Sequence, residues 1–109
     1  MKTIKSPSKK WPGEVVLSDP LTFPQVLKLE DALREAQAAG DNISLTRANY
    51  LLLPGILACV ERFALEGFPE MVTADTFPAT PRMESAQLIA WLIAEVMKLY
   101  RDAVEIPNE

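Results

Sequence analysis

The sequence contains no histidine and a single cysteine, Cys59, among its 109 residues. Histidine is the commonest general base and the commonest metal ligand, so its absence removes thiol–imidazole catalysis and the usual zinc sites. A lone cysteine cannot form an internal disulfide, which favours a reducing compartment. Because Cys59 lies inside an apolar stretch, we expect a small buried hydrophobe and not a reactive thiol.

Glycine is also scarce, and the four glycines at positions 13, 40, 55 and 67 are isolated from one another. They cannot form a glycine-rich phosphate loop, and we expect neither a cofactor nor a bound metal. Carboxylate pairs are the remaining catalytic candidates, at Glu30–Asp31 and at Glu61 and Glu66. Neighbouring acids on a helix usually form a solvated face, and catalysis would require a pocket that shifts their pKa values. We therefore predict that the protein is not an enzyme.

Long apolar runs are absent as well, since no uncharged stretch approaches the ~20 residues that span a bilayer. Four of the 11 basic side chains lie in residues 1–10, which contain no acid, so seven basic side chains accompany 15 acidic ones in the remaining sequence. An acidic body argues against nucleic acid as the main partner, because binding to phosphates depends on clustered Lys and Arg. We expect a cytoplasmic protein that binds neither nucleic acid nor membrane.

The first part of the chain is predicted to be extended. Residues 1–12 have two prolines and no periodicity, which is typical of a flexible basic leader. Residues 14–18 contain a β-branched run that is too short to build a sheet alone, so we interpret them as an arm that lies on a neighbour or pairs with another chain.

The rest of the chain is predicted to be helical. Thr22 and Gln25 fit a capping box before a helix that stops at Gly40. The next helical region contains Pro54, so we predict two helices, over residues 47–53 and 55–66. A proline-punctuated connection over 68–81 precedes a last helix, which has Thr80 as its cap and Pro81 at its first position and whose apolar residues continue from Met83 to about Val104. The sequence therefore predicts an all-α fold, a bundle of about four helices in one domain over 13–106, with a tail over 107–109.

Two segments are candidates for binding another protein. The last helix is apolar around more than half of its circumference, which suits a helix packed on two sides, one of which a second copy of the chain could supply. Its narrow polar stripe contains Trp91, which is equally well explained as an interface anchor and as a residue covered by the 68–81 connection. The arm could offer strand pairing to a partner, or lie across its own bundle. The predicted protein-binding residues are Trp11, Val15 and Leu17 on the arm and Glu84, Trp91, Glu95 and Tyr100 on the last helix.

Three segments of the sequence resemble a known family. The segment GEVVLSDPLTFPQV at residues 13–26, followed by an acidic helix, is similar to the tail assembly chaperones of long-tailed bacteriophages, as are FPATP at 77–81 and SAQLIAWL at 85–92. The resemblance is a pattern of caps, prolines and helices without a chemical signature. It implies a helical, non-catalytic protein that acts in the cytoplasm of the bacterial host, keeps the tape measure protein soluble and, as a second partner, recruits the tail tube protein.

Three other functions stay open at this point. The chain could be a small acidic phage inhibitor that imitates phosphate charge to block a host nucleic-acid-binding enzyme. That function needs acids along one exposed face, whereas Glu30, Asp31 and Glu35 share their helix with Lys28 and Arg34. A structural virion subunit would use the arm and the last helix as permanent contacts. An enzyme based on carboxylates would need a cleft with paired acids.

Overall fold

A computed structural model describes residues 1–40, 42–68 and 83–105. In these residues the elements follow the order β1 (Lys2–Lys5), β2 (Gly13–Leu17), α1 (Phe23–Ala38), α2 (Leu45–Leu57), β3 (Val60–Leu65) and α3 (Met83–Val104). The fold combines helices with a three-stranded antiparallel sheet and belongs to the α+β class. The prediction of an all-α bundle of about four helices is therefore wrong.

The sheet has the order β1-β2-β3, so the predicted arm is its central strand. Val15 of β2 lies opposite Ile4 of β1 on one side and Phe63 of β3 on the other, with an irregularity in register between Val16 and Leu17. The expected flexible leader contributes β1, and the arm finds both partners within its own chain. These pairings satisfy the backbone groups that an isolated strand would leave open.

Strand β3 occupies residues that the sequence analysis assigned to a helix over 55–66. The apolar residues there fit a helical period, yet Phe63 and Leu65 are buried while Ala64 between them is exposed, which is the alternation of a half-buried strand. Pairing with β2 stabilises the strand and not the helix. The periodicity of the sequence alone could not distinguish the two, because a short apolar run is compatible with both.

The start of α1 is confirmed in detail. The Thr22 hydroxyl accepts a hydrogen bond from the Gln25 N–H at 3.3 Å, and Gln25 Oε1 accepts one from the Thr22 N–H at 2.8 Å, which completes the capping box. Gln25 Nε2 also donates to Ser18 Oγ at 2.8 Å and to the Ala58 carbonyl at 3.1 Å. One side chain thus joins the start of α1 to the residues that follow β2 and α2.

Helix α2 continues through Pro54 to Leu57, so the predicted break at this proline does not occur. At the residue after it, Gly55, the backbones of α1 and α2 lie close together. A Cβ atom at this position would lie 2.9 Å from the Ala32 Cβ and 2.9 Å from the Lys28 carbonyl oxygen. Gly55 therefore permits a helix contact that a larger residue would force apart.

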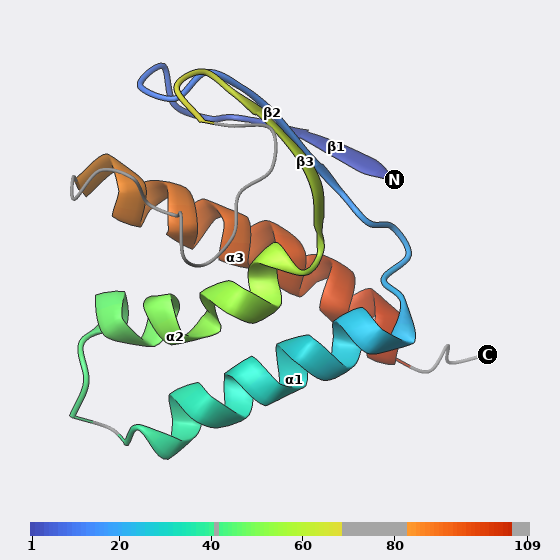
Figure 1. Ribbon diagram of the computed structural model, residues 1–109, viewed down its shortest axis with the longest axis vertical. Helices are drawn as coiled ribbons and strands as arrows, with labels where there is room; N and C mark the ends of the chain where they lie inside the picture. The colour runs from blue at the N-terminus through green and yellow to red at the C-terminus, as the bar shows by residue number, and fades with distance from the viewer. Residues whose placement is uncertain (41, 69–82, 106–109) are drawn as a thin grey trace.

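Helix α3 covers the apolar residues from Met83 to Val104 on which the last helix was predicted, while the expected cap at Thr80 and first position at Pro81 lie outside the described residues. The helix lies between two layers. Figure 1 shows the sheet on one side of α3 and the antiparallel α1–α2 pair on the other, with the chain's N-terminus at β1. One apolar cluster joins the layers, and its fully buried members come from every side. They include Leu17 of β2, Leu29 of α1, Ile56 of α2, and Leu88, Leu92 and Val96 of α3.

Candidate functional site

The three residues predicted on the arm lie in the core. Trp11 is 4% exposed, and the side chains of Val15 and Leu17 in β2 are completely buried in the core. As the central strand of the sheet, β2 has no edge to offer to a partner. A binding role for these residues was predicted without the strands on either side of β2, which enclose it.

Trp91 is half-buried and packs against Trp11. The two ring centroids are 5.3 Å apart and the rings are tilted by 42°, which is within the range of favourable aromatic pairs. The Trp11 Nε1 donor is buried without a hydrogen-bond partner among the described residues. Trp91 therefore covers Trp11, which lies between β1 and β2, and holds that segment against α3. At least part of the role of Trp91 is thus in packing.

The remaining predicted residues on α3 have separate surroundings. Glu95 accepts a hydrogen bond from Lys98 Nζ at 3.3 Å within the same helix. The Tyr100 hydroxyl donates to Glu30 Oε2 on α1 at 3.0 Å. This hydrogen bond raises the pKa of Tyr100, and partial burial and the negative charge of Glu30 act in the same direction. Glu84 belongs to α3, but its side chain is outside what the structure describes.

The carboxylate pairs considered for catalysis do not form a clustered site. Asp31 is paired with Arg34 at 3.4 Å on the exposed face of α1, while its neighbour Glu30 is turned to Tyr100. Glu61 and Glu66 are exposed near opposite ends of β3. Among the described residues, no group of three or more acidic or cysteine side chains is placed to hold a metal ion.

Cys59 is fully buried at the end of α2, as expected for a small hydrophobe, and its Sγ lies 3.5 Å from the Gly55 carbonyl oxygen. Burial raises the pKa of the Cys59 thiol to about 11, from an ordinary value of 9.0. Since the thiolate is the reactive species, the buried thiol is poorly suited to act as a nucleophile.

Iodoacetamide labelling at pH 8 tests this description of Cys59. We expect the folded protein to react about 100-fold more slowly than the urea-unfolded chain, because a pKa higher by about two leaves correspondingly less thiolate and burial blocks access. Mass spectrometry of quenched samples measures both rates. Equal rates would show that the end of α2 opens readily and would contradict the buried, protonated thiol.

An apolar groove that the sequence analysis missed lies between the first turns of α2 and of α3. It encloses about 200 Å³. Leu45, which begins α2, is 78% exposed although it falls on the same side of the helix as the buried Ile56. The described residues thus leave the core-facing side of α2 uncovered at its beginning. The lining residues are Leu45, Thr46 and Asn49 of α2 and Ala86, Gln87, Ile89 and Ala90 of α3.

The groove continues as an apolar stripe along α3. Spacings of three, four and seven residues place the stripe on one side of the helix, between its buried and its fully polar faces. All five side chains are at least partly exposed: Ala86, Ala90, Ile93, Met97 and Val104. The stripe is the second apolar side of a helix that was predicted to pack on two sides. The structure places Trp91 and Glu95 on a different side of α3 from this stripe.

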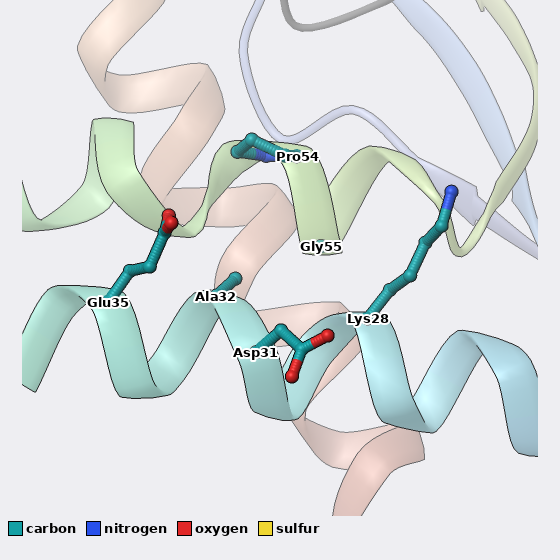
Figure 2. Close-up of a pocket in the computed structure, with 6 residues that line it drawn as sticks. All are labelled: Lys28, Asp31, Ala32, Glu35, Pro54 and Gly55. Atoms are coloured by element: carbon teal, nitrogen blue, oxygen red, sulfur yellow. The ribbon is translucent and has the colours of Figure 1, made fainter.

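A second hollow, of about 250 Å³, lies between α1 and α2. Figure 2 shows Lys28 and Glu35 of α1 extending on either side of Gly55, with Ala32 between them and Asp31 turned away from α2. Both signs of charge are present, and these acidic and basic side chains are exposed. The hollow lies beside Gly55, and its charged side chains are exposed to solvent and not brought together at a buried site.

Comparisons of the chain with protein-family models, curated proteins and solved structures found no match. Within the part of the chain that the structure describes, none of the helices is both long enough and apolar enough to cross a membrane. The apolar groove between α2 and α3 is therefore the candidate site that the geometry itself provides.

Proposed function

We propose that this protein is a non-catalytic chaperone of phage tail assembly that holds an amphipathic helix of the tape measure protein in the apolar groove between α2 and α3. The observation that carries the proposal is the groove, with its exposed Leu45 and its continuation along α3. The resemblance of residues 13–26, 77–81 and 85–92 to tail assembly chaperones supplies the class of client. Action in the cytoplasm of the bacterial host is part of the same proposal.

The chemistry of the groove suits a helical client. Helix-in-groove recognition places apolar anchors of the client at i, i+3, i+4 and i+7 against a hydrophobic channel. Ala86 and Ala90 lie one turn apart on α3, and their small side chains let another helix approach closely. Ile93 and Met97 extend the apolar contact by two further turns, and the flexible thioether of Met97 adapts to different partners.

Ala90→Glu and Ala94→Glu form a matched pair of variants for this proposal. Both alanines are exposed on α3, but only Ala90 lines the groove. We expect Ala90→Glu to weaken client binding by about tenfold or more, because a carboxylate would be buried against apolar surface. Ala94→Glu should bind nearly as well as the unmodified protein. Both should change the free energy of unfolding by less than about 0.5 kcal/mol, as exposed substitutions do.

The measurement is co-expression with a tape measure fragment, followed by size-exclusion chromatography with light scattering of each protein and of the pair. A fragment that is soluble only with this protein, and that co-elutes with it, supports the chaperone. A fragment that precipitates regardless overturns the function, and a stable ring or tube of this protein alone would favour a structural virion subunit. A complex that persists with Ala90→Glu overturns the placement of the client in the groove.

A further inference from the structure

The outer edge of β1 carries backbone groups that point away from the sheet. The Ser6 N–H donates to the Gly13 carbonyl at 2.9 Å, so Ser6 faces β2. Hydrogen bonding alternates along an antiparallel ladder, and Ile4 therefore also faces β2, while the N–H and C=O groups of Thr3 and Lys5 point outward. No strand or helix among the described residues pairs with this edge, which is the free side of the order β1-β2-β3 (Figure 1).

The same strand is basic, since β1 carries Lys2 and Lys5, and Lys9 and Lys10 follow in the connection to β2; the acid nearest to them in the ladder is Glu14, opposite Lys5. Residues 1–10 contain four lysines and no acid, whereas the protein as a whole has a net charge of −4. Lys5 and Lys9 are exposed and Lys2 is half-buried. Lysines on an edge strand discourage pairing between like edges, because two copies would bring lysine against lysine. They do not discourage an incoming strand of opposite charge.

We propose that β1 accepts an acidic extended segment of another protein as a fourth strand of the sheet. The backbone of Thr3 and Lys5 would supply the pairing, as in other complexes formed by strand addition. Side chains alternate, so the residue opposite the buried Ile4 should be apolar and those opposite Thr3 and Lys5 acidic. This surface belongs to the sheet, away from the α2–α3 groove, and does not depend on the proposed client there.

Two synthetic peptides test the proposal directly. One alternates glutamate with valine over seven residues, and the other has lysine in place of each glutamate. Each is titrated into the ¹⁵N-labelled full chain, with amide shifts and hydrogen exchange recorded. We expect saturable binding of the acidic peptide, with slower exchange confined to the Thr3 and Lys5 amides, and no binding of the lysine peptide. Weaker binding at higher salt should follow, because the contact is partly ionic.

Three variants separate strand pairing from simple charge attraction. Thr3→Pro removes an outward N–H but no bond to β2, and proline is tolerated at such edge positions. Lys5→Glu reverses the charge next to the incoming strand, and Lys28→Glu makes the same change on exposed α1. We expect Thr3→Pro and Lys5→Glu each to weaken binding of the acidic peptide by about tenfold, and Lys28→Glu to leave the binding unchanged. Circular dichroism checks that each variant is folded.

The opposite results overturn the proposal in distinct ways. Equal binding of the two peptides would remove the charge complementarity. Unchanged binding by Thr3→Pro would leave only charge attraction, and equal weakening by Lys28→Glu would show a contact that is not confined to β1. Absence of any exchange protection at Thr3 and Lys5 in the unmodified protein would overturn strand addition without reference to the variants.

Discussion

Replacement of Leu92 by alanine should lower the free energy of unfolding by about 3 kcal/mol, which is a large share of the stability of a domain of this size. Leu92 is completely buried in the middle of α3, the helix that separates the sheet from α1 and α2. The substitution removes apolar contacts and leaves a cavity that surrounding side chains can fill only in part. Urea denaturation followed by circular dichroism measures the loss.

Leu45→Ala is the matched control for this prediction, because it removes the same atoms from a leucine that is 78% exposed. We expect its free energy of unfolding to stay within about 0.5 kcal/mol of the unmodified protein. The slope of the urea dependence should not change in either variant, since both keep the compactness of the folded state. Similar losses in the two variants would contradict the burial assigned to α3.

Replacement of Gly13 by alanine is expected to lower the free energy of unfolding by about 3 kcal/mol or more, as much as the replacement of Leu92. Gly13 begins β2 with a φ of 130°, which residues with a Cβ rarely adopt. A Cβ atom there would also overlap the Ala64 carbonyl oxygen of β3, which is backbone and cannot turn aside. Backbone strain and steric overlap add, so β2 and β3 would have to separate at this end of the sheet.

Gly40→Ala separates the two contributions. Gly40 has a φ of 90°, and apart from its chain neighbours no described residue lies within 4 Å of where its Cβ would be. We therefore expect Gly40→Ala to lower the free energy of unfolding by about 1 kcal/mol, from backbone strain alone. Thermal and urea unfolding of the two variants under the same conditions measure the difference. Equal losses would mean that Ala64 moves aside freely, and the tight contact between β2 and β3 would then be an incorrect description.

The helices with strong local signals could be predicted from the sequence. The capping box at Thr22 and Gln25 involves residues three apart, and the periodicity of α3 extends over six turns, so neither depends on distant parts of the chain. The strands could not be predicted in this way. Lys2–Lys5 contains a single aliphatic residue, and its pairing with β2 becomes visible only when the two segments are brought together.

The candidate site could likewise be predicted only in part. The apolar width of the last helix predicted packing on two sides, and the α3 stripe is an apolar side that stays at least partly exposed; a partner on it remains a prediction. The positions nominated on the arm were incompatible with an exposed surface because β1 and β3 enclose β2. The groove itself depends on how far α2 diverges from α3 near Leu45, and this is a property of packing that no local pattern contains.

The position of α3 has a consequence for synthesis of the protein. The sheet and the α1–α2 pair both precede α3 in the chain, yet each buries its apolar side against that helix. During translation, at about 5–20 residues per second, both would therefore wait with exposed apolar surface until α3 leaves the ribosome. Neither half can complete its core early, so the emerging chain should itself be a transient client of general chaperones until its last helix is added.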